Sequence, residues 1–233
     1  MNDQIKKPRD RIIVALDLPT AAQALEMVAK ISGEVSFFKI GLQLYTAGGP
    51  EIVRAVSAKG GKVFLDLKLH DIPNTVGKAV RAAGDLGVDM LTIHLSGGRN
   101  MIEAAVRECP PHLLLLGVTV LTSSDDETLR EIGVGARVEE QTRRLARLGA
   151  EAGMRGLIAS PHEVRALRER FGEQMTIITP GVRPAWAKAD DQKRFTTPRE
   201  AIENGADYLV IGRPITAAAD PRDAARKVAA ELA

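Results

Sequence analysis

The chain has 233 residues, of which 45% are hydrophobic and 27% are charged, so it has the material for a sizeable core and is not typical of a disordered protein. Lysine and arginine number 32 against 30 acidic residues, and this near balance, with only 3% aromatic residues, argues against nucleic acid as a partner. The single cysteine excludes an internal disulfide and no apolar run is long enough to span a bilayer, so we expect a cytoplasmic protein without a membrane partner.

Short, continuously apolar runs alternate with longer amphipathic stretches along the whole chain. Such runs are typical of parallel strands that helices cover on both faces. In chain order, the predicted strands are Ile12–Leu16, Val35–Ile40, Val63–Leu67, Met90–His94, Leu113–Val120, Gly156–Ala159, Met175–Thr179 and Tyr208–Ile211. Eight strands alternating with helices predict an α/β fold, a (β/α)8 TIM barrel, with residues 1–233 as a single domain. The alternative is an open doubly wound sheet, although no G-x-G-x-x-G follows the first run to indicate dinucleotide binding.

Helices are predicted between these runs, and several have recognisable first residues. Apolar residues recur at helical spacing in Ala21–Ile31 and Val138–Ala150. Ser160 and Thr197 each precede a proline and stand three residues before a glutamate, which predicts a capped helix start at both places. Asp220, also followed by proline, predicts the start of the last helix.

Two connections are longer than ordinary loops, and long loops on a barrel are often functional. Leu121–Arg137 follows the fifth run, where Ser124 and Glu127 predict the cap of a short extra helix. Arg183–Thr196 follows the seventh run and is polar and charged.

Polar residues gather where the predicted strands end. They are Asp17, Lys39, Asp66, Lys68, His94, Thr119, Thr122, Pro180–Arg183, Gly212 and Arg213. All carboxyl ends of parallel barrel strands lie on one face, and this face holds the active site in barrel enzymes. Any one of these residues could be a loop cap or a solvated charge, but four charges from three adjacent strand ends point to a site.

The densest group of such residues follows the third run, in the segment DLKLHDIPNT from Asp66 to Thr75. Strand side chains alternate, so Asp66 and Lys68 point the same way, and Lys39 on the neighbouring strand can approach Asp66. We predict an alternating Lys–Asp–Lys array that keeps Lys68 fixed as a proton donor. A purely structural network of buried salt bridges is the alternative.

This segment resembles the signature of the orotidine 5′-monophosphate decarboxylase family. Other segments agree with that family in order and position, namely VALD with Asp17, FFKIG with Lys39, IHLSGG with His94, VLTS with Thr122, TPGVRP with Arg183, and VIGRPI with Gly212 and Arg213. The similarity extends from about Ile12 to Lys227.

The resemblance implies decarboxylation of orotidine 5′-monophosphate to uridine 5′-monophosphate and CO₂, the last step of de novo pyrimidine nucleotide synthesis, without metal or organic cofactor. It implies that Lys68 protonates C6 of the pyrimidine and that Asp66 lies beside the departing carboxylate, with Lys39 and Asp71 completing the catalytic set. The implied substrate-binding residues are Asp17, Lys39, Asp66, Ile72, Thr75, Thr122, Pro180, Arg183, Gln192, Gly212 and Arg213. The resemblance also implies a homodimer in which Asp71 and Thr75 reach the partner's site.

Gly212 and Arg213 are the predicted phosphate-binding residues. Barrels often bind phosphate at the loops after the seventh and eighth strands, where a glycine admits close approach of the backbone and an arginine offers a fork of donors. Gln192 lies in the charged loop and matches the family's lid contact. We hypothesise that this loop closes over the substrate and that Arg183 assists the phosphate or the lid.

The remaining candidate residues are weaker candidates for a functional role. His94 is expected to orient the Asp66–Lys68 pair or pack the barrel mouth, and we assign no role to His70. Cys109 has no obvious base beside it, and no set of residues has convincing metal-ligand spacing.

Two alternative functions remain open. One is a Mg²⁺-dependent sugar-phosphate decarboxylase or lyase of the same superfamily, which a chelator would inhibit. The other is a non-catalytic nucleotide-binding barrel, in which the charges only hold the ligand. Lys68→Ala separates it from the enzyme, in which decarboxylation should collapse while binding of the product nucleotide largely survives.

Overall fold

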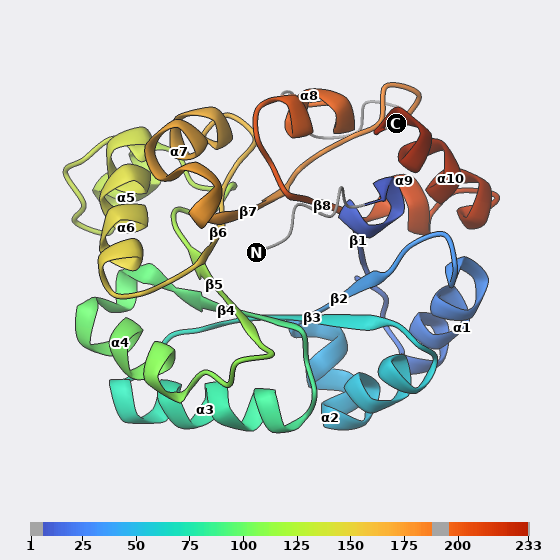
Figure 1. Ribbon diagram of the computed structural model, residues 1–233, viewed down its shortest axis with the longest axis horizontal. Coiled ribbons are helices and arrows are strands. Elements are labelled where there is room, and N and C mark those ends of the chain that lie inside the picture. Colours follow the sequence, from blue (N-terminus) through green and yellow to red (C-terminus); the bar gives the residue numbers. More distant parts are fainter. Residues whose placement is uncertain (1–6, 188–195, 233) are drawn as a thin grey trace.

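The computed structural model describes residues 7–187 and 196–232. Eight parallel strands close into a barrel in chain order, and the helices form a ring around it (Figure 1). The predicted (β/α)8 barrel is therefore confirmed. The strands are β1 (Ile12–Ala15), β2 (Phe37–Gly41), β3 (Lys62–Leu69), β4 (Met90–His94), β5 (Leu114–Val118), β6 (Gly156–Ile158), β7 (Thr176–Pro180) and β8 (Tyr208–Ile211).

Helices follow the strands on the outside of the barrel (Figure 1). They are α1 (Ala21–Ile31), α2 (Leu42–Ala58), α3 (Pro73–Asp85), α4 (Arg99–Glu108), α5 (Asp126–Glu131), α6 (Val138–Glu151), α7 (Val164–Phe171), α8 (Pro198–Glu203), α9 (Arg213–Thr216) and α10 (Pro221–Glu231). Short 3₁₀ turns occur at Pro8–Arg11, Leu95–Gly97 and Gly172–Gln174. None of the described helices combines the length and the apolar character that crossing a bilayer requires.

Two of the predicted helix caps are confirmed. Thr197 accepts a hydrogen bond from the backbone N–H of Glu200, and the Glu200 carboxylate accepts one from the backbone of Thr197, which completes a capping box at α8. Asp220 caps α10 through the backbone N–H groups of Arg222 and Asp223.

Two other predicted caps are wrong. The Glu163 carboxylate accepts a hydrogen bond from the backbone N–H of Ser160, as in a capping box, but α7 begins only at Val164, with Glu163 as its cap residue. In the loop after β5, the cap of α5 is Asp125 instead of Ser124, because the Asp125 carboxylate accepts from both the backbone N–H and the hydroxyl of Thr128 at 2.9 Å.

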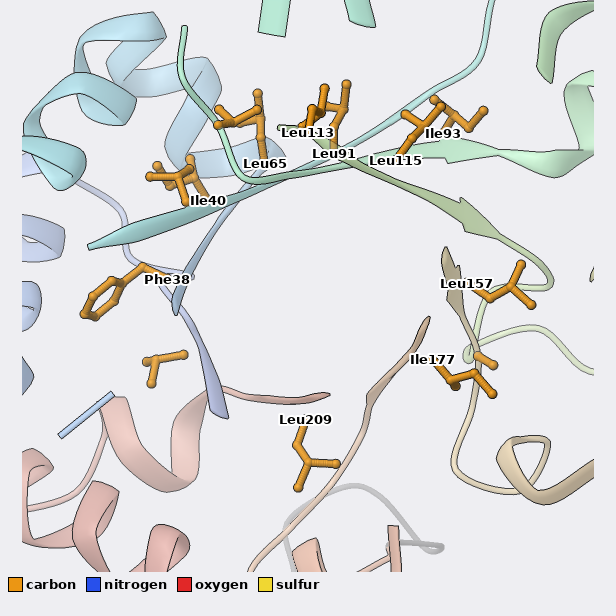
Figure 2. Close-up of a cluster of buried hydrophobic side chains, with 14 of the residues drawn as sticks. Phe38, Ile40, Leu65, Leu91, Ile93, Leu113, Leu115, Leu157, Ile177 and Leu209 are labelled. Atoms are coloured by element: carbon orange, nitrogen blue, oxygen red, sulfur yellow. The ribbon is translucent and has the colours of Figure 1, made fainter. Parts of the chain in front are cut away.

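The hydrophobic core has two layers, which the alternation along the strands keeps apart. Inside the barrel lie Ile13, Ala15, Phe37, Phe64, Met90, Leu116, Ile178 and Val210. Outside it, side chains such as Phe38, Leu65, Leu91 and Leu209 point from the strands toward the helices (Figure 2). Because Phe64 points inward, Asp66 two residues later also points inward, at the end where the interior cluster stops.

The amino ends of β4 and β8 carry matching aspartate contacts. Asp89, just before β4, accepts a hydrogen bond from the backbone N–H of Val63 at 2.8 Å, and Asp207, just before β8, accepts one from Ile177 at 2.8 Å. Asp207 also pairs with Arg168 of α7 at 2.6 Å. These contacts tie neighbouring strands together at the face opposite the predicted site.

Candidate active site

A cavity of about 330 Å³ opens at the carboxyl ends of the strands, within the usual size range of small-ligand sites. Most of the predicted site residues line it, namely Asp17, Lys39, Asp66, Lys68, Thr122, Pro180, Arg183, Gly212 and Arg213. Among the charged side chains at this cavity, cations outnumber anions. The cavity therefore suits a small anionic ligand.

One side of the cavity carries a row of four alternating charges. The ammonium of Lys39 lies 2.9 Å from Asp17 Oδ1 and 3.7 Å from Asp66 Oδ2. The ammonium of Lys68 lies 2.9 Å from both carboxylate oxygens of Asp66. The predicted approach of Lys39 to Asp66 is thus present, and Asp17 extends the array.

Burial strengthens the interactions at the centre of this row. The side chains of Lys39 and Asp66 are only 12% and 14% exposed, whereas Asp17 is 63% exposed. Coulomb attraction grows as water is excluded, so the Lys39–Asp66–Lys68 segment is the well-fixed part of the row. Asp17 pairs with Lys39 at the rim of the cavity, where most of its side chain is open to solvent.

The sequence reasoning missed Thr92 of β4, whose side chain is fully buried. Its hydroxyl donates a hydrogen bond to Asp66 Oδ1 at 2.9 Å and accepts one from the backbone N–H of Lys68 at 2.9 Å. The available signal was a single hydroxyl within the apolar run Met90–His94, on the same face as the inward-pointing Met90.

His94 packs against His70 at the end of β4, with ring centroids 5.5 Å apart. Burial is the main cause that lowers the pKa of His94, and the electrostatic effects of His70 and Lys68 lower it further, against a smaller opposing effect of Asp66. A neutral imidazole in this place suits packing at the barrel mouth better than donation of a proton.

The two arginines predicted to contact phosphate line the same cavity, at the ends of β7 and β8. Arg213 follows Gly212 at the start of α9, and Arg183 follows β7 and is only 8% exposed. The backbone N–H of Arg183 bonds Thr196 O at 3.0 Å, which closes the base of the loop after β7. Gln192 lies outside the described residues.

Three predicted residues do not line the cavity of their own chain. Asp71, Ile72 and Thr75 stand at the start of α3 and are exposed, and Ile72 retains 66% of its surface. The Asp71 carboxylate accepts a hydrogen bond from the backbone N–H of Ile72 at 2.6 Å.

Cys109, for which no catalytic role was predicted, is half-buried, and burial raises the pKa of its thiol. Within residues 7–187 and 196–232, no three His, Cys, Asp or Glu side chains are grouped so that they could hold a metal ion.

Comparison with known proteins gives a consistent result. The family model described as "Orotidine 5'-phosphate decarboxylase / HUMPS family" matches residues 10–228. A protein of Moorella thermoacetica named orotidine 5′-phosphate decarboxylase is 53% identical over 233 residues, which cover 96% of this chain and 92% of that protein. A protein of the same name from Syntrophotalea carbinolica is 51% identical and covers 97% of this chain and 96% of its own length.

Solved structures agree with these sequence matches. The crystal structure of orotidine 5′-phosphate decarboxylase from Lactobacillus acidophilus superposes with a TM-score of 0.85 at 37% identity, covering 96% of this chain and 99% of that one. The resemblance recognised in the motifs is therefore confirmed. With matches that extend over nearly its whole length, the chain belongs to the orotidine 5′-phosphate decarboxylase / HUMPS family.

Proposed function

We propose that this protein converts orotidine 5′-monophosphate to uridine 5′-monophosphate and CO₂ in pyrimidine nucleotide synthesis. The observation that carries the proposal is the fixed Asp66–Lys68 pair in a cavity with an excess of cationic side chains. The two relatives described above, at about half identity, both bear the name of this activity.

The bond between C6 and the carboxylate breaks so that its electron pair stays on C6 and CO₂ leaves as a neutral molecule. The ammonium of Lys68 then gives a proton to C6, which forms the C6–H bond of the product and leaves a neutral amine that solvent reprotonates. Asp66, held 2.9 Å from that ammonium, fixes its position.

The positioned ammonium of Lys68 accounts for only part of the rate enhancement that an enzyme typically achieves. At ~4 Å from a developing carbanion it contributes about 4 kcal/mol at an effective dielectric constant near 20, whereas enzymes lower barriers by ~8–23 kcal/mol. Binding energy from the remote phosphate must supply a further share, which Arg183 and Arg213 are placed to provide. Asp17 and Lys39 are assigned to the ribose, Thr122 and Pro180 to the rest of the nucleotide, and Gln192 to the loop that covers it.

Lys68→Ala tests this assignment. We expect decarboxylation, followed by the absorbance of the pyrimidine, to fall by at least about 10²–10⁴-fold, because the proton donor is gone. Binding of uridine 5′-monophosphate, measured by calorimetry, should largely survive. The matched control is Lys62→Ala, which removes an exposed lysine from the other end of the same strand; retained activity in Lys68→Ala alongside an active control would refute the assignment.

We also propose a homodimer in which Asp71, Ile72 and Thr75 complete the partner's site. All three are exposed at the start of α3 and stand outside their own cavity, and Ile72 is a large apolar side chain left open to solvent. Sedimentation at micromolar concentration should give twice the chain mass of 25.1 kDa, and Ile72→Asp should shift the protein toward monomer.

A Mg²⁺-dependent sugar-phosphate lyase is the second candidate, because the family description includes HUMPS. The acidic side chains of the cavity do not favour it, since Lys39 lies between Asp17 and Asp66 and pairs with both. We propose that the reaction needs neither metal nor organic cofactor, so a chelator should leave decarboxylation unchanged. Nucleic acid is not proposed as a partner.

Two further proposals concern the whole chain. The closed barrel supports a single domain over residues 1–233, which one cooperative unfolding transition would test. A cytoplasmic location is in keeping with the lone cysteine and is testable by fractionation.

A further inference from the structure

The pairing of β3 with β4 is uneven at the catalytic end of the barrel. Leu65 is paired with Leu91 and Leu69 with Ile93, so three residues of β3 stand opposite one residue of β4. The three are Asp66, Leu67 and Lys68, and the one is Thr92. A local excess of this kind leaves backbone groups of the longer strand without their regular ladder partners.

The backbone of Lys68 is strained within this irregular segment. Its φ is 49°, and it is the one non-glycine residue with a positive φ in the part of the chain that the structure describes. Residues other than glycine adopt a positive φ only at an energetic cost, and the surrounding structure must hold them in this conformation. Both a strained backbone and the proposed proton donor therefore meet in a single residue.

The Thr92 hydroxyl is the group that holds this arrangement. It accepts a hydrogen bond from the backbone N–H of Lys68 and donates one to Asp66 Oδ1, each at 2.9 Å. Thr92 is 0% exposed, so solvent does not replace either bond readily. A hydroxyl can donate and accept at once, which neither valine nor alanine can do.

We propose that Thr92 is a positioning residue for decarboxylation, which fixes the strained backbone of Lys68 and the carboxylate of Asp66 through one hydroxyl. It lies beneath the two charged residues and is not among the residues that line the cavity. This inference rests on the proposed function, because it assigns Thr92 to the same reaction.

The decisive comparison is Thr92→Ser against Thr92→Ala. Both variants remove the methyl group, and only serine keeps the hydroxyl. We expect kcat to fall by about 10- to 100-fold in Thr92→Ala, the effect of one buried polar pair left unsatisfied, and to stay within a few-fold of the original protein in Thr92→Ser. KM and the affinity for uridine 5′-monophosphate should change little in either, because Thr92 does not line the cavity.

Thr92→Val adds a variant of unchanged volume, and Thr142→Val is its matched control. Thr142 is 1% exposed and its hydroxyl also donates to a carboxylate, that of Glu163, but it belongs to α6 outside the barrel. Thr92→Val should lower kcat while Thr142→Val leaves it unchanged. If Thr92→Val does not fold, the serine and alanine pair decides alone.

Equal kcat values in Thr92→Ser and Thr92→Ala would overturn the inference, and so would a loss expressed only in KM. Failure of the proposed function is a separate result, because the unmodified protein would then show no decarboxylation at all.

Discussion

At the scale of single residues, the site depends on which side chains the strand ends turn inward. Phe37 and Phe64 fill the barrel interior, and the residues two positions later, Lys39 and Asp66, continue the same face into the cavity. Because side chains two positions apart in a strand share a face, the charged residue that follows each interior phenylalanine by two positions points into the cavity. This is why the charges could be predicted from the sequence.

Gly41, at the end of β2, leaves the space in which Asp17 and Lys39 meet. A Cβ atom at Gly41 would lie 3.1 Å from the Lys39 ammonium and 3.3 Å from Asp17 Oδ1. We predict that Gly41→Ala displaces this ion pair and raises KM by about 3- to 10-fold, with a smaller effect on kcat, since the pair is assigned to the ribose. Steady-state kinetics tests this, and an unaltered KM would show that the pair tolerates the methyl group.

His94 gives a prediction about pH. Burial lowers its pKa below the ordinary 6.5, so the folded state favours the neutral imidazole. The resulting stabilisation is fully present above pH 6.5 and is lost as the pH falls through the lower, folded-state pKa. An NMR titration of the imidazole should therefore give a midpoint below 6.5, and His94→Gln should remove part of the acid sensitivity of unfolding.

The control for that measurement is His162→Gln, which alters an exposed histidine in the turn before α7. A His94 midpoint at or above 6.5 would contradict the prediction.

At the scale of elements, the sequence predicted β4, β8 and α1 with their observed bounds, because apolar runs and helical spacing are local signals. It misplaced the caps at Ser124 and Ser160, because the cap residues of α5 and α7 are Asp125 and Glu163, one and three residues further along the chain. It could not predict Thr92, whose role depends on how β3 and β4 are aligned, and alignment between strands is not encoded in either strand alone.

Arg168 of α7 gives a prediction at this scale. Its guanidinium donates to the carbonyls of Gly205 and Met175 and to the Asp207 carboxylate, and only 15% of its side chain is exposed. Arg168→Met leaves the largely buried Asp207 without its cation, so we expect urea denaturation to show a loss of about 2–4 kcal/mol.

The matched control is Arg165→Met on the same helix, where an exposed arginine bonds Asn204. Arg165→Met should lower the free energy of unfolding only slightly. Decarboxylation at low temperature should be retained in both variants because these contacts lie on the face opposite the cavity, and a large fall in kcat for folded Arg168→Met would argue against this separation.

At the scale of the whole molecule, stability and chemistry occupy opposite ends of the barrel. Asp89 and Asp207 fasten strand pairs at the amino ends, whereas the charged residues of the cavity lie at the carboxyl ends. Barrel enzymes show this division in general. It allows the carboxyl ends to carry a strained residue such as Lys68 without endangering the closure of the sheet.

The proposed dimer predicts complementation between two inactive variants. Lys68→Ala and Asp71→Ala are each expected to be impaired, but a mixed dimer contains one site that receives both native residues. Random re-association of equal amounts should restore about a quarter of the original activity per site, by the statistics of a two-fold dimer. Activity assays after co-refolding test this, with each variant refolded alone as the control; no recovery would contradict sharing of sites between subunits.

The surplus of two residues in β3 relative to β4 has an implication for protein engineering. Deleting those two residues would let β3 and β4 pair evenly and would remove the backbone strain at Lys68. The shortened chain should therefore be more rigid, but it should lose decarboxylation. Selection for heat resistance alone would thus tend to remove the irregularity, because the strained backbone lowers stability and is useful only for the chemistry at this end of the barrel.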